Sequence, residues 1–99
     1  MRVIFNIHED RAAKTAGWRA EAVHVNDRNE AHLDETLKAV VLKDGSTIHD
    51  YLIEGDRLKD AWELYVNGVK MTGALNLKTK IKDNTQIHLM ANPRSTSHE

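Results

Sequence analysis

Residues 62–71 read Trp62-Glu63-Leu64-Tyr65-Val66-Asn67-Gly68-Val69-Lys70-Met71 and indicate a β-hairpin. Apolar and polar residues alternate before the turn, so Trp62, Leu64 and Val66 would share one face of a strand. Asn67 and Gly68 both tolerate the positive φ angles that the two central positions of a tight hairpin turn require. The stretch therefore predicts an antiparallel pair of strands in the second half of the chain.

Three more segments are predicted to be strands, namely residues 2–7, 19–25 and 86–90. The first and last alternate apolar and polar residues, which is typical of a sheet with one buried face. The middle one is weaker, since it consists mainly of Ala, Val and His. The residues predicted to face the core are Val3, Phe5, Ile7, Ile87 and Leu89.

Residues 30–55 fit two arrangements. Leu33, Leu37, Val40 and Val41 have helical spacing, whereas the same region is also rich in the β-branched residues of a strand. Thr47 and Asp50 are spaced like a capping box, which favours a helix that starts there. The preferred prediction is a strand over 36–43, a turn at Asp44-Gly45, a helix over 47–54 that ends before Gly55, and a short turn over 57–60. The alternative is a helix over 30–43.

The composition is that of one small globular domain. The chain has 99 residues, of which 40% are apolar and 29% charged. It has no cysteine, which excludes disulfides and thiol chemistry. No apolar run reaches the ~20 residues of a membrane helix, and the N-terminal apolar stretch is too short for a signal peptide. We therefore expect a cytoplasmic protein with no membrane association.

Three segments together resemble the β-grasp proteins of the ubiquitin-like superfamily, especially the sulfur carriers of thiamin and molybdopterin synthesis (the ThiS and MoaD type). Residues 41–52, VLKDGSTIHDYL, resemble the family's strand, glycine turn and helix start. Residues 64–69, LYVNGV, resemble its central strand, and residues 81–89, IKDNTQIHL, its closing turn and strand. Asn84 stands where the family has glycine, and both residues favour left-handed backbone. The resemblance implies an α+β fold, a β-grasp mixed sheet of four to five strands packed on one helix.

The predicted domain covers residues 1–91 as a single β-grasp unit. Residues 8–35 depart from the family pattern, either as an insertion in the first hairpin or as an added edge strand. Residues 92–99 contain Pro93 and no large apolar residue, so they are predicted to form a disordered tail.

The carriers and protein modifiers that the sequence resembles act through a C-terminal Gly-Gly. The five glycines of this chain are never adjacent, and none follows the last predicted strand. We therefore expect a non-catalytic ubiquitin-like protein-interaction module or accessory subunit, and not a sulfur carrier or conjugated modifier. One alternative is an RNA-associated domain like the TGS domains of translation enzymes. Another is a degenerate carrier relative that docks on an adenylating enzyme.

A protein partner is expected to bind the exposed face of the sheet. Tyr65, His88 and Met90 would point outward from their strands, and Tyr and Met are enriched at interfaces. Lys78 and Lys80 alternate with apolar residues in 75–82, which fits either a fifth strand or a crossing loop. Their charges could bind a partner or phosphates. Nucleic acid is an unlikely partner, because the net charge is −1 and only 5% of residues are aromatic.

No catalytic, cofactor or metal site is predicted. The six histidines show neither H-x-H nor H-E-x-x-H spacing. No nucleophile elbow or phosphate-binding loop is present in the sequence. The chain is therefore not expected to be an enzyme or to hold a cofactor or metal.

Overall fold

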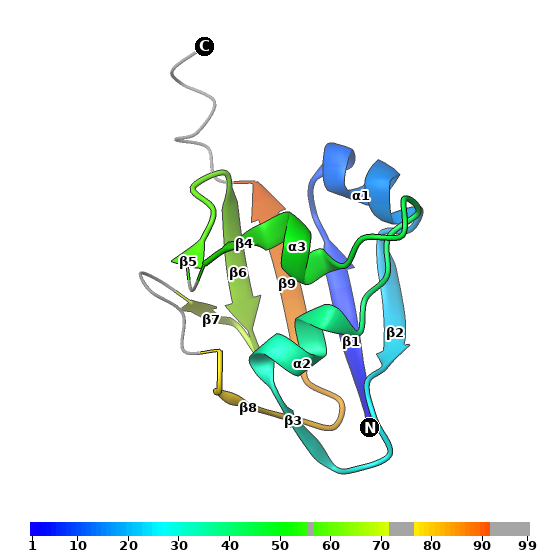
Figure 1. Ribbon diagram of the computed structural model, residues 1–99, viewed down its shortest axis with the longest axis vertical. Coiled ribbons are helices and arrows are strands. Elements are labelled where there is room, and N and C mark those ends of the chain that lie inside the picture. Colours follow the sequence, from blue (N-terminus) through cyan, green and yellow to red (C-terminus); the bar gives the residue numbers. More distant parts are fainter. Residues whose placement is uncertain (56, 72–76, 92–99) are drawn as a thin grey trace.

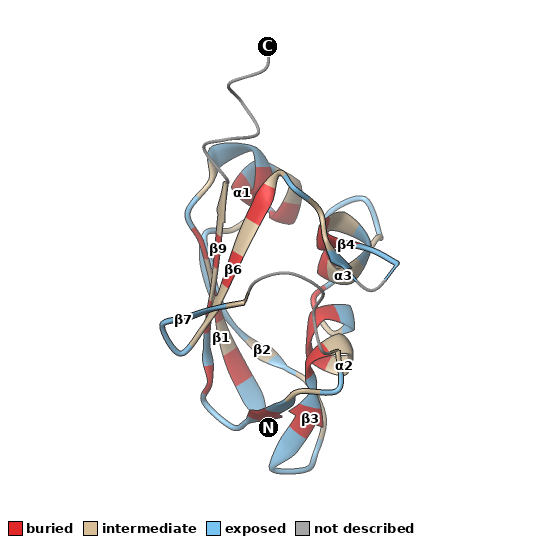
Figure 2. Ribbon diagram, turned by 90° about the vertical axis from the view of Figure 1, so that its left-hand side faces the viewer, coloured by how far each residue is buried: buried red, intermediate tan, exposed pale blue. Residues whose placement is uncertain are grey.

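The computed structural model describes residues 1–55, 57–71 and 77–91. These residues form a mixed five-stranded sheet with helices packed against one face (Figures 1 and 2). The opposite face of the sheet has no helix over it in Figure 2. The molecule thus has two layers, and the core lies between them.

The sheet has the strand order β2-β1-β9-β6-β7. The central strand is β9, and it pairs in parallel with β1, which comes from the opposite end of the described chain. The other neighbours are antiparallel. The strands are β1 (Arg2–Ile7), β2 (Ala20–His24), β6 (Trp62–Val66), β7 (Val69–Met71) and β9 (Gln86–Ala91).

The inner face of the sheet is built from the alternating apolar residues. Six of the predicted inward residues are at most 3% exposed: Val3, Phe5, Ile7, Leu64, Ile87 and Leu89. Trp62 is 6% exposed, whereas Val66, at the end of its strand, is only half-buried. The hairpin turn is confirmed, because Asn67 and Gly68 both have positive φ, at 49° and 83°. Asn84 likewise has φ of 64°, the conformation in which Asn replaces Gly at least cost.

The predicted strand over 36–43 is wrong. The region instead holds helix α2 (Leu33–Lys38), a shorter version of the alternative helix over 30–43. Leu33 and Leu37 lie one turn apart and are fully buried, so the helix presents both to the core. Beyond the helix Val41 makes only an isolated bridge to Thr47, and it is 62% exposed. Burial of one helical face therefore outweighed the local β preference.

Helix α3 (Ile48–Leu52) begins where predicted. The Thr47 side chain accepts a hydrogen bond from the Asp50 backbone N–H, and the Asp50 side chain accepts one from Thr47 in return. The helix is shorter than the predicted 47–54, because β4 (Ile53–Glu54) pairs with β5 (Arg57–Leu58). Gly55, with φ of 68°, therefore belongs to the turn after β4 and not to the end of a helix. The fold class is confirmed, and the helical layer contains α2 in addition to the predicted helix.

The segment between β1 and β2 contains a helix that the sequence analysis did not predict. Helix α1 (Asp10–Ala16) starts at the capping side chain of Glu9 and ends at Gly17, whose φ is 87°. It buries three alanines, Ala12, Ala13 and Ala16. After it, β2 forms the edge of the sheet beside β1.

A second, two-stranded ladder joins β3 (Glu30–His32) to β8 (Lys80–Lys82). It lies beside α2, whose first backbone N–H groups donate to the carbonyls of Thr79 and Leu77. Residues 75–82 thus contain a strand over 80–82, while 75 and 76 lie outside the described residues. The predicted tail, 92–99, also lies outside them.

Candidate functional site

The candidate surface is the face of the five-stranded sheet turned away from the helices, here called the outer face. The strand registers place five side chains in one row across it: Ala20, Asn6, His88, Tyr65 and Lys70. Neighbouring rows contain Ile4, Ala22 and Gln86, and Met90 opposite Glu63. The outer face therefore mixes apolar, aromatic and hydrogen-bonding groups.

Three predicted site residues, Tyr65, His88 and Met90, lie together on the outer face and are half-buried. Tyr65 donates its hydroxyl hydrogen to Glu63 Oε1 at 3.4 Å, and Lys70 Nζ lies 3.1 Å from Glu63 Oε2. The Glu63 carboxylate thus accepts a hydrogen bond from Tyr65 and forms an ion pair with Lys70. These contacts fix the Tyr65 ring on the sheet.

His8 and His88 form the closest side-chain contact on this face. His8 Nε2 lies 2.8 Å from His88 Nδ1, the ring centroids are 5.1 Å apart, and the rings are inclined by 19°. The rings therefore meet edge to edge through their nitrogens, and one ring donates an N–H to the other. His8 immediately follows β1, and its backbone N–H donates to the Leu89 carbonyl at 2.9 Å.

The other two predicted site residues, Lys78 and Lys80, do not lie on the outer face. Lys78 Nζ lies 3.4 Å from Asp34 Oδ2 at the start of α2. Lys80 is opposite His32 in the β3–β8 ladder. It lines a cavity of about 120 Å³ with Arg28, Glu30, Ala31, His32 and Glu35. The cavity is smaller than the ~300–1,000 Å³ typical of ligand sites, and its lining charges are of both signs.

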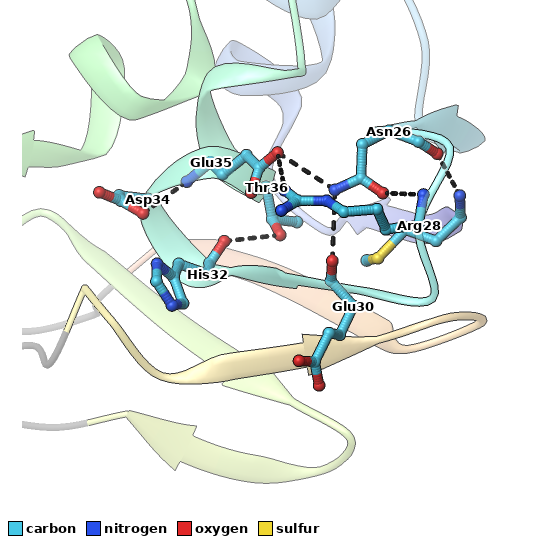
Figure 3. Close-up of polar contacts among 8 residues, drawn as sticks. Asn26, Arg28, Glu30, His32, Asp34, Glu35 and Thr36 are labelled. Atoms are coloured by element: carbon cyan, nitrogen blue, oxygen red, sulfur yellow. Dashed lines mark hydrogen bonds and ion pairs between the residues drawn. The ribbon is translucent and has the colours of Figure 1, made fainter.

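A polar network beside this cavity, centred on Glu35, ties the connection before β3 to α2 (Figure 3). Asn26 Nδ2 donates to Glu35 Oε2 at 3.1 Å, and Arg28 donates to both carboxylate oxygens at 3.0 and 3.1 Å. The Asn26 hydrogen bond, against the opposing effect of desolvation and with the help of Arg28, lowers the pKa of Glu35 below its ordinary value. The Glu35 network therefore stabilises the fold, and its hydrogen bonds are internal to the chain.

The described part of the chain contains no cluster of three or more His, Cys, Asp or Glu residues arranged to hold a metal ion. No helix among the described residues has the length and apolar character needed to cross a membrane. Sequence reasoning missed His8 as the neighbour of His88. These residues come from opposite ends of the chain, and only the parallel pairing of β1 with β9 brings them together.

Comparisons with known proteins show what this chain resembles. No family model matches the sequence, and no curated protein matches it. One similar solved structure is SAMP1 from Haloferax volcanii, with a TM-score of 0.67 and 19% identity over 93% of this chain and 96% of that one. A second is the H. volcanii small archaeal modifier protein 1, with a TM-score of 0.62 and 21% identity over 90% and 94%.

These neighbours correct the functional expectation. The prediction of an interaction module that is not a sulfur carrier or conjugated modifier is wrong, because a modifier protein shares its architecture over nearly the whole chain. The prediction was based on the absence of two adjacent glycines, which ease passage through a narrow enzyme channel but are not required to build the fold. The RNA-associated and carrier-docking alternatives gain no support from these two structures. The chain has the ubiquitin-like β-grasp fold that the motifs in 41–52, 64–69 and 81–89 indicated.

Proposed function

We propose that this chain is a ubiquitin-like modifier-type protein, which enzymes and partner proteins recognise as a folded unit. The observation that carries the proposal is the match to small archaeal modifier protein 1, which covers at least nine-tenths of both chains.

In this role the chain is a substrate of enzymes and not itself an enzyme. Its terminal carboxylate would attack the α-phosphate of ATP, forming an acyl-adenylate and releasing pyrophosphate. The amine of a target lysine would then displace AMP, lose a proton and form an amide. Because this chemistry consumes ATP, the proposal places the protein in the cytoplasm.

The outer face supplies the surface for protein recognition in this proposal. Tyr65, His88 and Met90 are half-buried there, and their rigid strands limit the entropy lost on binding. Ile4 and Ala22 extend the apolar area in the next row. Lys78 and Lys80 lie in the β3–β8 ladder and are not part of the proposed docking face.

The test of attachment is an extract of the native cells supplemented with ATP and the purified chain. An antibody against the chain should detect species of higher mass that survive denaturation and reduction. Mass spectrometry should find a lysine of another protein amide-linked to the chain's terminus. A matched sample, in which the terminal carboxylate is blocked as an amide, should give none. The same species of higher mass in both samples, or none in either sample, would contradict attachment.

The docking face is tested on a partner identified in that experiment. The double variant Tyr65→Ala with Met90→Ala should bind this partner at least about tenfold more weakly, as loss of central interface anchors does. Its melting temperature should stay close to that of the wild type. Val41→Ala removes a more exposed apolar side chain from the connection between α2 and α3, and it should not change affinity. Equal affinity for both variants would exclude the outer face.

A further inference from the structure

We propose that His8 and His88 form a surface site for one divalent first-row transition-metal ion, with Cu²⁺ bound most tightly. The sequence predicted no metal site, because no pair of histidines has a ligand spacing along the chain. The structure brings these two together across β1 and β9. The proposal concerns the isolated chain and does not depend on the modifier role.

The distance between the two nitrogens suits a chelate. Two imidazole nitrogens bound at about 2.1 Å in neighbouring positions of a square-planar Cu²⁺ ion lie about 3.0 Å apart. His8 Nε2 and His88 Nδ1 are 2.8 Å apart, so they need to separate by only about 0.2 Å. The rings must also turn, because their nitrogens now point at each other and must point at a common ion. His8 is exposed and His88 is half-buried on the outer face, so the rings can make this adjustment without disturbing the core.

The backbone positions of both residues are fixed before an ion arrives. His88 is paired with a neighbouring strand on each side, opposite Asn6 in β1 and Tyr65 in β6. His8 is held to β9 by its hydrogen bond to Leu89. Binding would therefore cost little backbone entropy, which favours chelation over binding to single exposed histidines.

The chemistry of the donors decides the class of ion. Neutral imidazole suits Zn²⁺, Ni²⁺ and Cu²⁺, and affinity for a given site rises toward Cu²⁺ along the first row. Ca²⁺ and Mg²⁺ prefer oxygen ligands and are excluded by this donor set. Water would complete the coordination sphere, since His8 is exposed.

Binding of the ion needs no proton donor or acceptor other than water, because the two imidazole rings only rearrange their hydrogens. Each neutral ring carries one N–H, and one of these now lies between the rings. For binding, His8 must carry its hydrogen on Nδ1 and His88 must carry its hydrogen on Nε2. One ring therefore changes tautomer through solvent, and the neutral pair releases no net proton.

The experiment is calorimetric titration of the purified chain with Cu²⁺, Ni²⁺, Zn²⁺ and Mg²⁺ at neutral pH. We expect one Cu²⁺ per chain, weaker Ni²⁺ and Zn²⁺, and no Mg²⁺ binding. His8→Gln and His88→Gln should each weaken Cu²⁺ binding at least about tenfold. His24→Gln is the matched control, because His24 is an exposed histidine in β2 of the same sheet, and it should bind like the wild type.

Two further measurements separate loss of the metal site from loss of the fold and locate the bound ion. Circular dichroism of each variant without metal should show unchanged structure, because neither imidazole belongs to the core. In NMR spectra, sub-stoichiometric Cu²⁺ should broaden the signals of His8, His88 and Met90 first. Undiminished Cu²⁺ binding by both glutamine variants, or earliest broadening at Met1 or His24, would overturn the proposal.

Discussion

Leu37 and Val41 provide the sharpest test of the helical layer. A strand over 36–43 would place both side chains on one face, and a helix over 30–43 would place them one turn apart. In the structure Leu37 is fully buried in α2, whereas Val41 is 62% exposed. Truncation of a buried leucine to alanine costs about 2–5 kcal/mol. Leu37→Ala should therefore lower the free energy of unfolding by about 3 kcal/mol, and Val41→Ala by less than about 0.5 kcal/mol.

Urea denaturation, monitored by circular dichroism, measures the change in the free energy of unfolding for both variants. In a chain of this size a loss of 3 kcal/mol lowers the melting temperature by about 12 °C or more. If Leu37→Ala fails to fold, Leu37→Met, which conserves volume, should fold and cost less than about 1.5 kcal/mol. Equal costs for Leu37→Ala and Val41→Ala would refute the assignment of α2 and the exposure of the segment after it.

Three other substitutions test features that fix the fold. Thr47→Ala removes the capping side chain of α3 and should cost about 0.5–2 kcal/mol in urea denaturation; an unchanged midpoint would show that the cap adds nothing. Asn84→Ala should cost about 1 kcal/mol because of its positive φ, whereas Asn84→Gly should be nearly neutral, and the reverse order of midpoints would contradict this account. Glu35→Gln tests the Glu35 network by pH. Because the pKa of Glu35 is lowered in the folded protein, its stabilising effect is present above the ordinary value of 4.5 and is lost as pH falls through the folded pKa. The stability difference between wild type and Glu35→Gln should therefore shrink below pH 4.5, and a constant difference would exclude the carboxylate as its source.

The predictions that succeeded depend on local backbone chemistry. Asn67-Gly68 specifies a turn because both residues accept positive φ, and Thr47 with Asp50 specifies a helix start through hydrogen bonds three residues apart. Alternation in β6 and β9 identified their buried faces, because side-chain direction in a strand depends only on position.

The predictions that failed required tertiary information. Residues 36–43 carry β-branched side chains, and only the burial of Leu33 and Leu37 against the sheet selects a helix there. Helix α1 has just seven residues and buries only alanines, so no large apolar stripe reveals it in the sequence. The contact between His8 and His88 depends on the register of β1 with β9, which sequence spacing does not encode.

The parallel pairing of β1 with β9 has a consequence for biosynthesis. The pairs Ile4 with Gln86 and Ile7 with Leu89 join β1 to β9, which among the described strands is the one that the ribosome makes last. A nascent chain therefore carries Val3, Phe5 and Ile7 without their central neighbour until almost all of the domain has emerged. Such long-range pairing slows folding, and the unshielded strand would be a binding site for molecular chaperones during translation.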